Sequence, residues 1–254
     1  MTVFIFESLR EIDPKTGKQI HEFLNEKGIP NEFNPFHSKN ELLDLLREIK
    51  KKIAINNIQP YVHFDCHGND DGIVVVKNDG TEELITWGEI RDAFEEIYIA
   101  SGQQSIICMS SCEGFNVAKL VACFKPCPYK YVCGSFEKIS FQDSYNGYTK
   151  FYELIFNGTS IHDATVEIHT DLSLEKLKFL AYDSKQLYKI GFDGYINTLC
   201  TEEKLKQRKE SAKTSLSKDG HISREQIDKL NHAYSLEGQK ELLERYAKIF
   251  FSLQ

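Results

Sequence analysis

Short apolar segments and helix-like segments follow one another along most of the chain. Short segments rich in apolar and β-prone residues, typical of buried strands, occupy residues 3–8, 58–64, 105–109 and 129–133. Apolar residues spaced three or four positions apart predict helices over 15–27, 38–49, 87–99, 115–124, 145–156 and 162–182. This order of strands and helices predicts an α/β fold, with a mainly parallel sheet and helices on its faces.

Turn and cap residues predict further features of the fold. Asn78-Asp-Gly80 lies between two β-prone runs, 73–76 and 83–86, and predicts a hairpin. Ser38 with Glu41 three residues later predicts a helix N-cap. Residues 188–198 are expected to form a late edge strand. Residues 201–254 are polar, helix-prone and interrupted near 215–221, so we expect a first domain over 1–200 and a helical C-terminal extension over 201–254.

Composition narrows the class of protein. The 254 residues are 41% hydrophobic, enough for one sizeable core and a small appendage. No apolar run reaches the roughly 18 residues of a membrane span, and the N-terminus lacks a basic leader, so we expect a cytoplasmic protein with no membrane partner. The net charge of −7 and the absence of a long basic stripe argue against nucleic acid as a partner.

Two of the predicted strands end in residues that can carry chemistry. The 58–64 run continues into Asp65-Cys-His-Gly68, and the 105–109 run continues into Ser110-Ser-Cys-Glu-Gly114. Sites in open α/β sheets form beyond the carboxyl ends of the strands. If the two strands are parallel neighbours, the imidazole of His67 and the thiol of Cys112 meet at the same edge.

A thiol next to an imidazole is suited to nucleophilic catalysis. A free cysteine has a pKa of about 8.5, so it needs a base or a positive environment to react at neutral pH. His67 supplies the base, and the predicted helix after Cys112 favours the thiolate. The N–H groups of Gly68 and Cys112 are the expected donors to an oxyanion.

These segments resemble the catalytic strands of CHAT-type peptidases, in the caspase and separase group. Tyr61-Val-His-Phe-Asp-Cys-His-Gly68 is similar to the histidine strand of that family, and Ile107-Cys-Met-Ser-Ser-Cys-Glu-Gly114 is similar to its nucleophile strand. The resemblance covers about residues 55–185. It extends in order through Val132-Cys-Gly-Ser135, Asp143, Phe151-Tyr152, Leu154, Gly158 and Ala164. Phe136-Glu-Lys138 stands where the family usually has a tryptophan, which affects the substrate pocket rather than the dyad.

The resemblance implies a caspase-like three-layer α/β sandwich that hydrolyses peptide bonds of a protein or peptide substrate. It implies His67 and Cys112 as the catalytic dyad, without metal or organic cofactor. In relatives of separase type, the acidic residue corresponding to Asp143 faces a basic substrate side chain, so cleavage after Lys or Arg is expected. CHAT-type peptidases are often switched on by a partner or signal in bacterial defence and cell-death systems, and the 201–254 extension is a natural place for such control.

Other interpretations remain open at this point. Cys112 can be an inert core thiol, in which case the chain is a caspase-like binding or scaffold protein. His63, Cys66 and His67 with Cys108 or Cys112 can instead begin the zinc site of a hydrolase, although Cys66, Cys108 and His63 are better explained as packed core residues. Asp65 can orient His67 or be a solvated turn residue, and Asp143 can be a plain helix N-cap.

Overall fold

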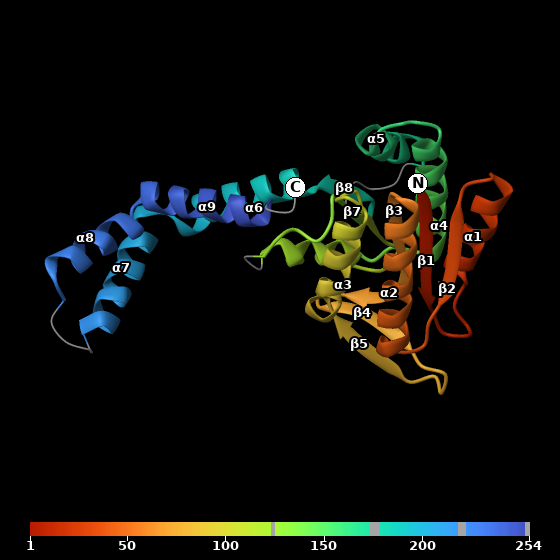
Figure 1. The fold of residues 1–254 in the computed structure, drawn as a ribbon, viewed down its shortest axis with the longest axis horizontal. Helices are drawn as coiled ribbons and strands as arrows, with labels where there is room; N and C mark the ends of the chain where they lie inside the picture. Colours follow the sequence, from red (N-terminus) through yellow and green to blue (C-terminus); the bar gives the residue numbers. More distant parts are fainter. Residues whose placement is uncertain (123–124, 173–177, 218–221, 252–254) are drawn as a thin grey trace. The chain divides into compact units, whose positions relative to one another are not determined.

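The computed structural model of the 254-residue chain describes residues 1–122, 125–172, 178–217 and 222–251. These residues form two compact units (Figure 1). The sheet unit consists of the described residues up to Ser184 except 125–126, and the helical unit consists of those two residues and the described residues from Lys185 onward. The helical unit thus begins before residue 201, where the sequence pattern sets the start of the C-terminal extension.

The sheet unit is built on a mixed, mainly parallel sheet, which confirms the predicted α/β class. Its main path runs β2-β1-β3-β6-β7-β8, with β8 antiparallel to β7 and the other neighbours parallel. The strands of this path are β1 (Thr2–Ser8), β2 (Asn31–Pro35), β3 (Pro60–Asn69), β6 (Ile106–Met109), β7 (Tyr131–Gly134) and β8 (Leu180–Asp183). The predicted hairpin is present as β4 (Gly72–Val76) and β5 (Glu82–Thr86), which branch from the end of β3.

Helices cover both faces of the sheet because alternate strand residues point to opposite sides. On one face Val3 and Ile5 share a buried core with helices α1 (Thr16–Glu26), α4 (Phe141–Phe156) and α5 (Ile161–Asp171). On the other, Phe64 stacks on Phe6 with ring centroids 5.1 Å apart and meets Phe94 of α3 at 5.6 Å. There α3 (Trp87–Ala100) lies beside α2 (Lys39–Asn56), as Figure 1 shows.

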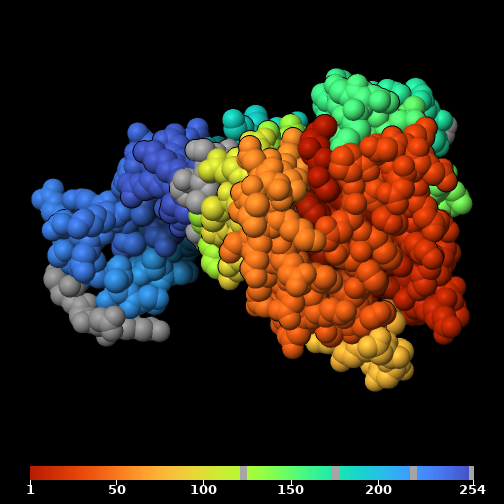
Figure 2. Space-filling view, turned by 45° about the vertical axis from the view of Figure 1, so that its right-hand side comes forward, coloured from red at the N-terminus to blue at the C-terminus, as the bar shows by residue number. Residues whose placement is uncertain are grey.

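Local signals account for where several elements begin. The Ser38 hydroxyl accepts a hydrogen bond from the Glu41 N–H at the start of α2, so the predicted N-cap is confirmed. Trp87 opens α3, and its indole N–H donates to the Asp70 carbonyl at 3.0 Å. Its backbone N–H donates to Asp71. The turn between β3 and β4 is therefore tied to a helix start, while the hairpin tip (amber in Figure 2) projects from the lower edge of the unit.

Several predicted elements differ from the structure. The segment 162–182 is not one helix, because α5 ends at Asp171 and 180–183 pair with β7 as β8; residues 173–177 lie outside the described residues. The segment 115–124 forms a 3-10 helix over Gly114–Ala122 instead of an α-helix, and residues 123–124 lie outside the described part. Strand β2 has no counterpart among the predicted elements.

The predicted edge strand over 188–198 is wrong, since this segment lies in helix α6 (Ser184–Leu199). The helical unit also contains α7 (Glu202–Ser217), α8 (Arg224–Ala233) and α9 (Leu236–Phe250). The hydroxyls of Tyr188 and Tyr195 in α6 donate hydrogen bonds to the Leu243 carbonyl and the Gln239 side chain of α9, contacts that the local sequence pattern does not contain. Within the described residues, no helix is both long and apolar enough to cross a bilayer.

Candidate active site

Strands β3 and β6 align the two residues expected to carry the chemistry. Their parallel ladder pairs each β3 residue with the residue 45 positions later, from Tyr61 with Ile106 to Phe64 with Met109. The Ser110 N–H extends the ladder by donating to the Phe64 carbonyl at 2.8 Å. Cys112 also follows His67 by 45 positions. The ladder therefore brings the strand ends that lead to His67 and to Cys112 side by side.

Gly68 lies directly against the nucleophile segment. A methyl group built on Gly68 would lie 3.0 Å from the Ser111 side chain and 3.1 Å from the carbonyl oxygen of Cys112. A side-chain carbon at that separation would push its neighbours apart, so the absence of a side chain at Gly68 allows the end of β3 to lie this close to the backbone of Cys112. The two catalytic segments predicted from the sequence are thus adjacent in space.

A tight turn presents Cys112 at the edge of the sheet. Glu113 has a φ of 56°, a left-handed conformation that turns the chain sharply after Cys112. The N–H of Glu113 donates to Glu137, and the N–H of Phe115 donates to Ser135, so the turn is bonded to the segment after β7. The Cys112 thiol is half-buried and lies 3.8 Å from the Ile139 carbonyl. Among the described residues, the backbone N–H of Cys112 has no hydrogen-bond acceptor.

His67 contacts an acid that the sequence pattern did not single out. Its Nε2 lies 2.8 Å from Oδ2 of Asp13, in the loop between β1 and α1. The side chains are 29% and 11% exposed. Burial acts to raise the pKa of Asp13, but hydrogen bonds from His67 and from the Arg10 N–H outweigh it and hold this pKa below its usual value. The Phe141 ring packs edge-on against the imidazole, with centroids 6.2 Å apart.

Asp65 neither orients His67 nor lies in a solvated turn. It is buried, at 1% exposure, and accepts a hydrogen bond from the Thr16 hydroxyl at the start of α1. It is therefore neither a solvated turn residue nor the partner of His67, which is Asp13. Burial raises the pKa of Asp65 to about 7, the charge of Glu7 adds to this, and hydrogen bonds from Thr16 and Gly17 act against it.

Asp143 lies in the first turn of α4, the helix that also carries Phe141. Its backbone N–H donates to the hydroxyl of Ser140, so Ser140 is the N-cap and the N-cap explanation of Asp143 is wrong. The carboxylate of Asp143 is half-buried and makes no hydrogen bond or ion pair with another described residue. It is therefore free to interact with a group that is not part of the chain.

Cys66, Cys108 and His63 have structural explanations. Cys66 and Cys108 are buried, at 3% and 0% exposure, as predicted for core residues. His63 is also buried, with its Nδ1 bonded to the Tyr152 hydroxyl at 2.8 Å. Burial lowers the pKa of His63 to about 3. Within the described ranges, no three His, Cys, Asp or Glu side chains are grouped as metal ligands.

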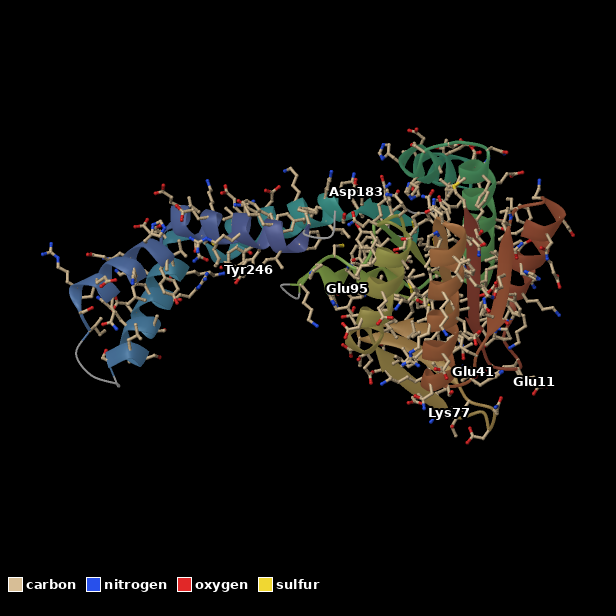
Figure 3. The ribbon with its side chains drawn as sticks, in the orientation of Figure 1. Glu11, Glu41, Lys77, Glu95, Asp183 and Tyr246 are labelled. Carbon is tan, nitrogen blue, oxygen red and sulfur yellow. The ribbon has the colours of Figure 1, made fainter. Side chains whose placement is uncertain are left out.

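The candidate site lies at the carboxyl end of the parallel strands. Glu11 follows β1, Glu41 follows β2 and Lys77 follows β4, and Figure 3 shows all three at the same, lower end of the sheet unit. Asp183, which pairs with the first residue of β7, lies at the opposite end. No protein-family model matches the chain, and no curated protein matches it.

Proposed function

We propose that the sheet unit is a caspase-like cysteine peptidase of the CHAT type, in which Cys112 is the nucleophile and His67 is the general base and acid. One observation carries this proposal. The parallel β3–β6 ladder brings the strand ends that lead to His67 and Cys112 side by side, and Gly68 lies against the backbone of Cys112. A thiol, a base and backbone N–H groups at one exposed edge are the components of acyl transfer.

The reaction begins with proton transfer from the Cys112 thiol to His67. The thiolate attacks the carbonyl carbon of the scissile peptide bond, so an S–C bond forms and the carbonyl electron pair moves onto oxygen. When the pair returns, the C–N bond breaks, and the leaving nitrogen takes the proton from His67. Water then gives a proton to His67 and its oxygen attacks the thioester carbon. The C–S bond breaks, and Cys112 leaves as the thiolate.

The negative oxygen of the tetrahedral intermediate requires hydrogen-bond donors. The N–H of Cys112 is supported for this role because it bonds to no other described residue and belongs to the nucleophile itself. The N–H of Gly68 is the second proposed donor, since Gly68 lies beside the Cys112 carbonyl. A single donor of this kind lowers the barrier by roughly 3–4 kcal/mol in well-studied enzymes.

Asp143 is the proposed selector of the substrate side chain. Its carboxylate is unpaired among the described residues and lies in the same helix turn as Phe141, which contacts His67. A Lys or Arg side chain of the substrate would form a charge-assisted hydrogen bond with it, which an apolar side chain cannot. The proposed substrate is therefore a protein or peptide cleaved after a basic residue.

Profiling a peptide library with the wild type, Cys112→Ala, His67→Ala and His63→Ala tests the proposal. We expect cleavage by the wild type, none by Cys112→Ala, a loss of roughly a hundredfold or more in His67→Ala, and little change in His63→Ala. A thiol-directed peptidyl ketone should label Cys112 alone. A folded wild type that cleaves no peptide and whose Cys112 resists the label would refute the proposal in favour of a binding protein with the same fold.

A further inference from the structure

The hydrogen bond between Asp13 and His67 connects two segments 54 residues apart in the chain. Asp13 follows β1, the strand next to β3 on the side away from β6. The imidazole thus lies at the end of the middle strand of three, with Cys112 following one neighbour and Asp13 following the other. The carboxylate contacts His67 through Nε2, which leaves Nδ1 for a second partner.

The loop of Asp13 also holds its carboxylate in place. The Arg10 N–H donates to Asp13 Oδ2 at 2.9 Å, and the Asp13 N–H returns a bond to the Arg10 carbonyl at 3.1 Å. Lys15 Nζ lies 2.9 Å from the Leu9 carbonyl and 2.6 Å from that of Arg10. The Arg10 guanidinium pairs with Glu82 of β5 at 2.6 Å. The carboxylate is therefore held by the Arg10 N–H as well as by His67.

This contact determines which ring nitrogen carries the proton. An ionised carboxylate only accepts hydrogen bonds, so Nε2 of His67 must be the donor. In the neutral imidazole with Nε2 protonated, the lone pair is on Nδ1. No other described residue forms a hydrogen bond with Nδ1 of His67. The nitrogen that can take a proton is thus the one directed away from Asp13.

We propose that Asp13 is a positioning residue of the Cys112–His67 pair, which selects the Nε2–H tautomer so that Nδ1 of His67 takes the Cys112 proton. The inference rests on the proposed function. When Nδ1 is protonated, the imidazolium donates from Nε2 to the Asp13 carboxylate, so the positive charge formed in the reaction meets a fixed negative one. The chain then has the three members in the order Asp13, His67, Cys112.

The competing explanation is that the contact only ties the loop to the sheet. Two variants separate these explanations. Asp13→Asn keeps the size of the side chain but removes its charge. The oxygen that contacts Nε2 is the one that accepts from the Arg10 N–H, so the amide oxygen keeps this place and accepts from Nε2 without a negative charge. Glu82→Gln removes the charge from the Arg10 pair and loosens the loop while the Asp13 carboxylate remains. A purely structural role predicts that both variants act alike.

The test measures two quantities on the full chain. Nitrogen-15 NMR of histidine-labelled protein, assigned with His67→Gln, reports the tautomer of His67. We expect Nε2–H in the wild type and in Glu82→Gln, and a smaller share of this tautomer in Asp13→Asn, because a neutral oxygen holds the proton on Nε2 less strongly. The rate of Cys112 alkylation by iodoacetamide at pH 7 should fall roughly tenfold or more in Asp13→Asn, because the imidazolium then faces no negative charge, and less than about twofold in Glu82→Gln.

The outcomes distinguish this inference from the proposed function. If His67→Ala leaves the alkylation rate of Cys112 unchanged, the Cys112–His67 pair itself fails. If His67→Ala slows alkylation while Asp13→Asn does not, the pair stands and the role of Asp13 is refuted. Equal slowing in Asp13→Asn and Glu82→Gln also refutes it, in favour of a structural contact. Should Asp13→Asn not fold, an Nδ1–H signal from His67 in the wild type overturns the inference by itself.

Discussion

Replacing Asp65 by Asn should raise the free energy of unfolding at neutral pH, and should raise it less in acid. Burial raises the pKa of Asp65 from 3.8 to about 7, with a contribution from the Glu7 charge. The folded state therefore keeps a proton that the unfolded state has already lost between these values. The stability that this group contributes is complete below about pH 4 and is lost as the pH rises through about 7.

The size of the effect follows from the size of the shift. A rise in the pKa of Asp65 from 3.8 to about 7 corresponds to a loss of roughly 4 kcal/mol of folding stability between these two pH values, at about 1.4 kcal/mol per pH unit. Asn cannot ionise, and its amide oxygen accepts the same hydrogen bond from Thr16. We expect the stability of Asp65→Asn relative to the wild type to rise by roughly 3 kcal/mol between pH 5 and pH 8.5.

Urea unfolding followed by circular dichroism at several pH values measures this difference. His63, whose pKa is lowered to about 3, contributes the opposite slope below its unfolded pKa, but it is present in both proteins and cancels in the comparison. Asp44→Asn, at an exposed position of α2, is the matched control and gives the baseline for exchanging a carboxyl for an amide. A difference for Asp65→Asn that does not exceed this baseline would show that the buried carboxyl does not titrate as the structure implies.

Three further changes probe the site. Cys108→Ala should lower the free energy of unfolding by about 1–2 kcal/mol in urea titrations and spare peptide hydrolysis, because the thiol is fully buried in the core. Asp143→Asn should lower kcat/KM for peptides with Lys or Arg before the cleaved bond by roughly tenfold, about 1.4 kcal/mol. Asp163→Asn, at the equivalent position of α5, should leave it unchanged; an equal effect on apolar peptides would contradict the selector role. Gly68→Ala should cost roughly 1–2 kcal/mol of stability and most of the activity, because its methyl group meets the backbone of Cys112. Gly88→Ala, where no atom lies within 4 Å of the added carbon, should do neither.

The sequence was sufficient for most of the sheet and for the arrangement of the two strand ends. Apolar runs identified β1, β3, β6 and β7, because buried parallel strands have few polar residues. Strand β2 was not predicted, because Asn31-Glu-Phe-Asn-Pro35 lacks such a run and pairs with β1 at the edge of the sheet. The prediction of a strand over 188–198 was wrong because the apolar residues of this segment suit a strand as well as a helix. Its contacts with α9 are not contained in the local sequence pattern.

The candidate site was predictable where local sequence carries the information. His67 and Cys112 stand at strand ends beside glycines, which is a local pattern. Asp13 is one acid among the 38 acidic residues of the chain, and its partner is 54 positions away. Nothing local distinguishes it, because the contact exists only once β1 and β3 are paired. Asp65 was misjudged for the same reason, since its burial depends on the start of α1.

The hydrogen bond between the Trp87 indole and the Asp70 carbonyl has a practical consequence. Trp87 is the only tryptophan of the chain, so all indole fluorescence comes from one buried side chain. That side chain is bonded to the turn that follows His67 and Gly68 directly. A ligand that moves this turn changes the indole hydrogen bond and with it the emission. The native protein thus contains an optical reporter beside its candidate site, and stopped-flow fluorescence can follow ligand association in real time without a label.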